Sequence, residues 1–291
     1  MGWMAIESYR SIEEAVKGTF GEDITIEADL KLLSNGKKIF FKFSDIGNPS
    51  SLNAEEEGIN AIAATNTIAV PKIYAKGTDK ERRVSFLMIE FIDRGMETNE
   101  NLKKMGYEFA DMHLADTKDF VKNGKYGFLH NNYIGLSKQI NTPKDTWIDF
   151  FRVCRLEPQL KMAEHALDLR ILKSASKLLD RLDNYLIEPD FPSLLHGDMW
   201  GGNYFIDRNG RAVIFDPAAY VGFCEADIAM TELFSPMAGA FYKAYYEKIP
   251  MKEGYRDRRD LYNLYHVLNH YNIFGGDYLY SAVNTILYYA G

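Results

Sequence analysis

Hydrophobic and polar positions alternate in two stretches near the start of the chain. In the first stretch, the apolar residues at every second position are Ile24, Ile26, Ala28, Leu30 and Leu32. In the second stretch they are Ile39, Phe41 and Phe43. A period of two is typical of a strand buried on one face, and the intervening Asn35-Gly36 suits the positive φ angles of a tight turn. Residues 24–43 are therefore predicted to form a β-hairpin.

A helix and further extended chain are predicted after this hairpin. Asn53 can cap a helix over residues 53–64, and the glutamates at 55–57 would fill its first turn, where the helix dipole favours negative charge. Extended chain begins at Val70-Pro71, and the apolar run over residues 84–92 favours a strand. These elements predict an α+β module with an antiparallel sheet in residues 1–93.

The period of the apolar residues becomes helical after residue 93. Helices are predicted over residues 101–114, 146–186, 227–234, 238–248 and 256–272. One β-like island interrupts them, because residues 204–206 and 212–215 flank a turn at residues 207–210. The chain is therefore predicted to have two lobes, a first over residues 1–93 and a larger, mainly helical one over residues 94–291.

Composition narrows the class of protein and its partners. The 291 residues are 46% hydrophobic and 26% charged, which is ordinary for a globular protein. With 41 acidic and 34 basic residues the net charge is −7, which weighs against a nucleic-acid partner. No apolar run is long enough to span a membrane, and the first ten residues do not resemble a secretory signal. Cys154 and Cys224 are too far apart in the sequence to form a metal-binding pair. We expect a cytoplasmic protein without a membrane partner, and its oligomeric state stays open.

Three polar residues accompany the β-like island. Asp198 and Asn203 lie five residues apart in a loop with three glycines, and Asp216 lies 18 residues after Asp198, at the end of the second strand. Because a hairpin brings the outer ends of its strands together, Asn203 and Asp216 are expected to be neighbours. Protein kinases share this layout: the first Asp accepts the proton of the acceptor hydroxyl, while the Asn and the second Asp hold Mg²⁺.

The first lobe supplies residues suited to bind ATP. Lys42 lies on a predicted strand, where a kinase lysine contacts the nucleotide phosphates, and Glu55 on the following helix is its expected ion-pair partner. The segment from Glu90 to Ile92 is expected to offer backbone groups to the adenine edge. A phosphate-binding loop is expected near Gly21, although Glu22 and Asp23 follow it, and such loops prefer several glycines and no negative charge.

At this point the sequence resembles a known family. Residues 196–203 (His-Gly-Asp-Met-Trp-Gly-Gly-Asn) and 215–218 (Phe-Asp-Pro-Ala) are similar to the motifs of the fructosamine (ketosamine-3-) kinases. Further similar segments are residues 132–135, 150–160, 225–234 and 261–270. The resemblance extends over residues 126–280, whereas in the first lobe only Lys42, residues 55–58 and Val70-Pro71 match.

The resemblance implies a bilobal protein-kinase-like fold related to the aminoglycoside and choline kinases. It also implies ATP- and Mg²⁺-dependent phosphorylation of the sugar 3-hydroxyl of ketosamines, either free or on glycated proteins, with a role in protein deglycation. By position, Asp198 would be the base, Asn203 and Asp216 the Mg²⁺ ligands and Lys42 the ATP lysine. Trp200 would stack on the sugar ring and Asn132 would contact the substrate, with core packing and loop capping as the alternatives.

Two other functions stay open. The same chemistry could act on an aminoglycoside or an amino alcohol. The chain could also be a nucleotide-binding pseudoenzyme, because the family has a Gly-Gly pair followed by Ile-Asn where this sequence has Gly21 followed by two acids.

Overall fold

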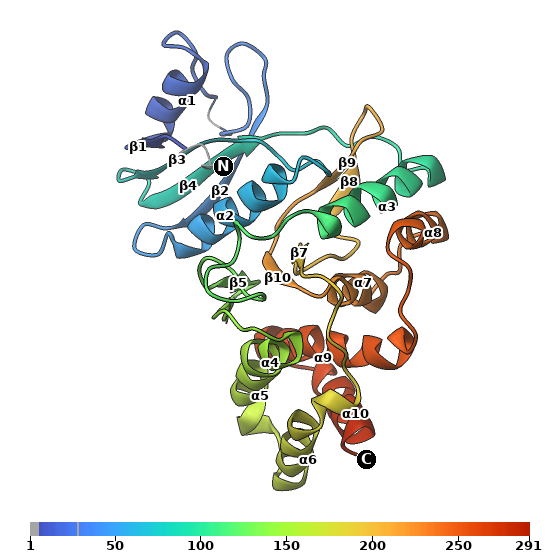
Figure 1. The fold of residues 1–291 in the computed structure, drawn as a ribbon. Coiled ribbons are helices and arrows are strands. Elements are labelled where there is room, and N and C mark those ends of the chain that lie inside the picture. Colours follow the sequence, from blue (N-terminus) through green and yellow to red (C-terminus); the bar gives the residue numbers. More distant parts are fainter. Residues whose placement is uncertain (1–5, 28) are drawn as a thin grey trace.

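The computed structural model describes residues 6–27 and 29–291 and places a small sheet at one end of the molecule (Figure 1). The sheet comprises β1 (Ser8–Tyr9), β2 (Ile39–Asp45), β3 (Ile73–Asp79) and β4 (Val84–Glu90), in the order β1-β3-β4-β2. The last three pair antiparallel, as predicted, whereas the two-residue edge strand β1 is parallel to β3.

Helices cover both faces of this sheet. Phe86 and Met88 of β4 join the core under α1 (Ile12–Phe20), while Leu87 and Ile89 pack with Leu52 of α2 (Ser50–Ala64). Because successive side chains of a strand point to opposite faces, β4 is buried on both sides, which accounts for its unbroken apolar run.

The predicted first strand of the hairpin is wrong. Among the described residues of this stretch, strand pairing is limited to the isolated bridges Ile26–Leu33 and Leu32–Lys38, because Leu30 has a left-handed φ of 56° that interrupts the extended backbone. Ala28 of that pattern lies outside the described residues. The apolar alternation reflects packing of this segment onto the α1 core rather than a regular strand. The turn at Asn35-Gly36 is present, with Gly36 at φ 81°.

Two helical details also differ from the sequence prediction. The α1 helix was not predicted, although Ser11 caps it by accepting a hydrogen bond from the backbone of Glu14. The α2 helix begins at Ser50, three residues before the predicted start, so Asn53 is not its cap and the glutamates lie beyond the first turn.

The rest of the chain forms a larger, mainly helical part with short strand pairs between it and the sheet (Figure 1). Its α-helices are α3 (Asn99–Leu114), α4 (Trp147–Phe151), α5 (Glu157–Ala163), α6 (Leu169–Asp180), α7 (Cys224–Leu233), α8 (Gly239–Lys248), α9 (Tyr255–Phe274) and α10 (Tyr278–Ala290). A π-helical turn (Arg152–Leu156) joins α4 to α5, and short 3₁₀ turns occupy Glu164–Ala166 and Leu182–Asn184. The antiparallel strand pairs are β5 (Asn132–Ile134) with β6 (Ser137–Gln139), β7 (Ser193–Leu195) with β10 (Tyr220–Gly222), and β8 (Tyr204–Ile206) with β9 (Ala212–Ile214).

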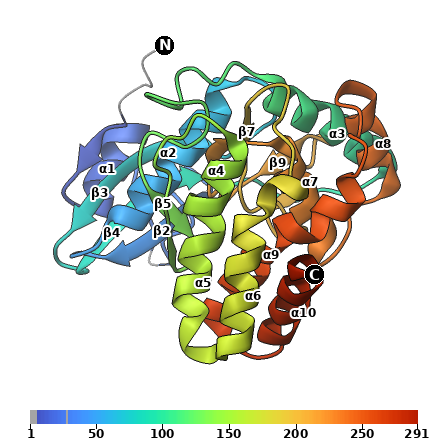
Figure 2. The ribbon, with the colours of Figure 1, turned by 60° about the horizontal axis from the view of Figure 1, so that its bottom comes forward.

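This arrangement confirms the bilobal α+β fold expected from the sequence. Helices α5, α6 and α10 lie side by side at the end away from the sheet, with α9 behind them (Figure 2). The buried ring of Trp147 packs among Phe151, Phe223 and Tyr262 at the centre of the helical core. Within residues 6–27 and 29–291, no helix combines the length and apolar character needed to cross a membrane. The lobe boundary at residues 93 and 94 stays a prediction.

Candidate active site

Lys42 lies where the two lobes meet. On β2, Phe41 faces the α1 core, so the alternation of the strand turns Lys42 towards α2 on the opposite face. Its Nζ forms ion pairs with the carboxylates of Glu55 on α2 and Asp216 beyond β9. Burial alone would lower the pKa of Lys42, but these two carboxylates outweigh it and raise the pKa, so the side chain stays cationic. Burial raises the pKa of Glu55, and Lys42 opposes that rise.

The β8-β9 hairpin brings Asn203 beside Asp216. Tyr204 pairs with Ile214, and one step further along the ladder the backbone N–H of Phe215 donates to the carbonyl of Asn203 at 3.1 Å. Asp216 follows with a left-handed φ of 57°. The spacing read from the sequence therefore corresponds to a real juxtaposition across a strand–turn–strand unit.

Asp198 is held against Asn203. The Nδ2 of Asn203 donates to the backbone carbonyl of Asp198 at 2.8 Å and to its Oδ2 at 3.3 Å. Burial, with Asp227 and Asp216 nearby, raises the pKa of Asp198 to about 7, although the bond from Asn203 acts in the opposite direction. A carboxyl with a pKa near neutrality is suited to take up a proton during a reaction.

A buried carboxylate fixes the loop that carries Asp198. Asp227 of α7 accepts hydrogen bonds from the backbone N–H groups of His196 at 2.7 Å and Gly197 at 2.9 Å. Its Oδ2 also lies 3.2 Å from Nε2 of His113, whose Nδ1 lies 2.7 Å from the hydroxyl of Tyr245. Burial acts to raise the pKa of Asp227, but the bond to His113 and the charges and backbone donors around it lower the pKa. The carboxylate therefore stays ionised inside the core.

Glycine is required at one point of this loop. Gly197 has a φ of 81°, and a Cβ there would lie 2.1 Å from the backbone oxygen of Ala218. The backbone N–H of Ala218 in turn donates to the carbonyl of His196 at 2.9 Å. The loop before Asp198 and the segment after Asp216 are thus packed directly against each other.

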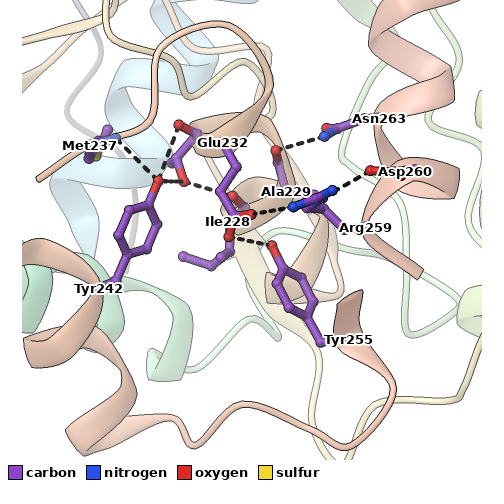
Figure 3. A network of polar contacts seen from close by, with 10 residues as sticks. Ile228, Ala229, Glu232, Met237, Tyr242, Tyr255, Arg259, Asp260 and Asn263 are labelled. Carbon is purple, nitrogen blue, oxygen red and sulfur yellow. Dashed lines mark hydrogen bonds and ion pairs between the residues drawn. The ribbon is translucent and has the colours of Figure 1, made fainter. Parts of the chain in front are cut away.

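Contacts with α9 hold α7 in place (Figure 3). Asn263 donates to the carbonyl of Ala229 at 2.9 Å, while Arg259 and Tyr255 contact the carboxylate of Glu232 at 3.3 and 3.0 Å. Because α7 carries Asp227, this network determines where the Asp198 loop lies.

Sequence reasoning assigned no role to His113. This histidine is fully buried on α3, among the apolar residues Met105, Phe109 and Met112. A single polar side chain on an otherwise apolar helix face was the available signal, and its partner Asp227 lies 114 positions away.

The structure places Gly21 away from a strand–strand loop. Gly21 caps α1, where its backbone N–H donates to the carbonyl of Lys17 at 2.8 Å. The segment expected to form the phosphate-binding loop therefore follows a helix, α1, and its contact with a nucleotide stays a prediction. The backbone N–H of Glu90 donates to the carbonyl of Lys72 at 2.8 Å. Among the described residues, the backbone groups of Ile92 form no hydrogen bond.

The two predicted substrate residues lie in different settings. Trp200 is 39% exposed, and its ring lies over Gly202, where a Cβ would come within 2.3 Å of it. Asn132 is 2% exposed, donates to the carbonyl of Ala219 at 2.7 Å and accepts hydrogen bonds from Gln139 and Asn141. The structure thus places Asn132 against the segment that follows Asp216, where it holds the backbone as the loop-capping alternative expects, and its contact with a substrate stays a prediction.

The donors at Asn203 and Asp216 fit Mg²⁺. Because Nδ2 of Asn203 is used by Asp198, its Oδ1 is the atom left for a cation, and Asp216 supplies a carboxylate from the facing strand end, where Phe215 is hydrogen-bonded to the Asn203 backbone. Mg²⁺ commonly takes one or two protein oxygens and completes its shell with water and phosphate. No group of three or more His, Cys, Asp or Glu in the described chain could enclose a metal ion.

Comparisons with known proteins identify relatives over nearly the whole chain. The fructosamine kinase family model matches residues 8–289. The chloroplastic protein-ribulosamine 3-kinase of Arabidopsis thaliana is 39% identical over 253 residues, which cover 85% of this chain and 74% of that protein. A crystal structure from Thermobifida fusca, assigned as a fructosamine-3-kinase, has 28% identity and a TM-score of 0.81 and covers 97% of this chain and 99% of its own.

A more distant structure shows the breadth of the fold. An aminoglycoside phosphotransferase with 13% identity superimposes with a TM-score of 0.59 over 95% of this chain and 97% of its own. The protein-kinase-like fold is therefore shared beyond the close relatives. Together with the family match and the identity to named kinases, it shows that the chain is a phosphotransferase and belongs to the fructosamine kinase family.

Proposed function

We propose that this kinase transfers the γ-phosphoryl group of ATP to the sugar 3-hydroxyl of a ketosamine, in a reaction that requires Mg²⁺. The observation that carries the proposal is the convergence of Lys42, Glu55 and Asp216 in one ion-paired cluster, with Asp198 and Asn203 beside it. The relatives supply the acceptor class, because one is a protein-ribulosamine 3-kinase and the other is assigned as a fructosamine-3-kinase.

Each residue of the cluster has a distinct part in the proposed reaction. Lys42, held by Glu55, would bind the nucleotide phosphates, and Asn203 and Asp216 would hold Mg²⁺. Bound there, Mg²⁺ would neutralise charge on the phosphate oxygens. Asp198 would accept the proton of the 3-hydroxyl while the oxygen of that hydroxyl forms a bond to the γ-phosphorus of ATP. The bond from the γ-phosphorus to ADP would break in the same step.

Buried contacts to the backbone fix the positions of Asp198 and Asp216 in the cluster. Asp227 fixes the loop before Asp198, and Asn132 fixes the segment after Asp216, so two buried polar side chains hold the proposed base and metal ligand from behind. The segment at Glu90 to Ile92 would receive the adenine edge, with Ile92 supplying the free backbone groups. Residues 1–93 would thus contribute the nucleotide side of the site and residues 94–291 the acceptor side.

A panel of acceptors tests this proposal. ADP release is measured with fructosyl-glycine, an aminoglycoside and an amino alcohol, each with Mg²⁺ and with excess chelator. We expect Mg²⁺-dependent turnover of fructosyl-glycine and a kcat/KM at least about 100-fold lower for the other two, since a site that hydrogen-bonds one acceptor leaves polar groups unpaired with another. Equal turnover of all three acceptors, or ATP binding without turnover, would contradict it.

A further inference from the structure

A continuous row of aromatic rings begins at Trp200, two residues after Asp198. We call it the aromatic row; its members are Trp200, Phe234, His270, Phe274 and Tyr278. The ring centroids are 6.2 Å apart for Trp200 and Phe234, 4.8 Å for Phe234 and His270, and 5.8 Å for His270 and Phe274. These separations are those of rings in direct contact.

The row is accessible to a ligand. Phe234 is 39% exposed, as Trp200 is, and Phe274 is 69% exposed. Single exposed apolar side chains are common on protein surfaces, but a contiguous group of them marks a binding surface. Here the group is also continuous with the proposed active site, because Trp200 is two residues from Asp198 and its backbone carbonyl accepts the N–H of Asn203 at 2.9 Å.

The rings come from four segments of the chain, with Trp200 in the loop after β7. Phe234 directly follows α7, while His270 and Phe274 are one turn apart on α9. Gly275 and Gly276 then both take a positive φ of 70°, which glycine adopts readily, where the chain turns from α9 into α10. As a result Tyr278 of α10 returns to within 5.2 Å of the His270 ring and 6.5 Å of the Phe234 ring.

Resting on the proposed function, we propose that the aromatic row binds the amine-bearing, non-sugar part of the acceptor, and that this part is the extended side chain of a glycated lysine in a peptide. A sugar whose 3-hydroxyl reaches Asp198 would lie near Trp200, so its amine substituent can continue along Phe234 and His270, and the peptide residues next to the lysine can reach Phe274. The secondary amine of a ketosamine is a cation at neutral pH, which aromatic faces attract. The methylene groups of a lysine then have apolar ring surface to cover.

Two acceptors of different length distinguish this role. One is a short peptide with a fructosylated lysine, and the other is fructosyl-glycine, whose amine carries only one methylene and a carboxylate. Loss of one ring contact costs about 1 kcal/mol, or about 5-fold in affinity. We expect Phe274→Ala to raise KM about 5-fold for the peptide, while KM for fructosyl-glycine and kcat for both acceptors stay within about 2-fold.

Matched variants control for the fold and for exposure. Tyr288→Ala removes a ring that is 75% exposed on α10, contacts only Tyr289 among the described rings and lies outside the row, so neither KM is expected to change. Phe274→Leu keeps an apolar side chain without the ring face and is expected to give an intermediate KM for the peptide. Thermal unfolding of all three variants verifies that they fold.

The outcomes separate this inference from the proposed function. An equal rise of KM for both acceptors, or no rise for the peptide, overturns the role of the row. Calorimetric binding of the glycated peptide, without ATP, gives a readout besides turnover. A 5-fold weakening by Phe274→Ala supports the row even if the phosphate is transferred elsewhere, whereas undetectable binding of the peptide by the wild-type protein overturns it.

Discussion

Asp198→Asn is expected to lower kcat for the phosphorylation of fructosyl-glycine by about 10³-fold, because an amide cannot accept the proton of the attacking hydroxyl. The substitution preserves shape, and the amide oxygen can still accept the hydrogen bond from Asn203 that the carboxylate accepts at 3.3 Å. The measurement is ADP release under saturating ATP and Mg²⁺. Turnover within about 10-fold of the wild-type rate would show that Asp198 is not the base.

The same variant is expected to be more stable than the wild type at alkaline pH. Burial raises the pKa of Asp198 from 3.8 to about 7, so the folded protein holds this proton more tightly than the unfolded chain does. The free-energy cost of ionising Asp198 in the folded protein is absent below about pH 4, grows between about pH 4 and 7, and is complete above about pH 7. Asp198→Asn should therefore raise the free energy of unfolding by up to about 4 kcal/mol at pH 8 and by little at pH 4.

Denaturant unfolding of both proteins at pH 4 and pH 8 checks this sign. An equal difference at the two pH values would contradict the burial of the ionised carboxyl. A substitution that stabilises the protein but removes its activity is expected where a functional residue lowers the stability of the fold.

Asp227→Asn is expected to destabilise the protein by about 3 kcal/mol. The carboxylate is buried and accepts hydrogen bonds from the backbone of His196 and Gly197 on different oxygens. An amide keeps one acceptor and turns the other into a donor, so one buried N–H would lose its partner and face a second donor. The displaced loop should also lower kcat at least about 10-fold, since a small misplacement of a reacting group is costly.

Urea unfolding measures the destabilisation, and Asp116→Asn is the matched control. Asp116 pairs with Lys118 on the surface, where an ion pair contributes less than about 1 kcal/mol. If the two substitutions cost the same, Asp227 would not have the anchoring role that its contacts indicate.

The sequence predicted the site better than it predicted the first lobe. Asp198, Asn203 and Asp216 could be placed because a hairpin converts their spacing into proximity, which is a local consequence of strand pairing. Lys42 could be joined to them only by its place in the order of kinase residues along the chain, since the contact with Asp216 spans 174 positions. His113 and Asp227 depend on packing between helices that no local pattern specifies.

The misses in the first lobe have local causes. Ser11 followed by Glu14 is a helix-start signal, and it does begin α1. The apolar residues over 24–32 do alternate with polar ones, and several of the apolar side chains pack onto the α1 core. Because Leu30 has a left-handed φ, however, the backbone forms a loop there and not a strand. Alternation reports which side chains are buried, whereas a strand also requires backbone partners along its length.

The position of the transferred phosphate tests the central claim most directly. Wild-type protein is incubated with fructosyl-glycine, ATP and Mg²⁺, and the product is analysed by ³¹P and ¹³C NMR. The account predicts a single phosphomonoester coupled to carbon 3 of the sugar, absent when Asp198→Asn replaces the wild type. A phosphate on another hydroxyl, or product formed equally by the variant, would contradict it.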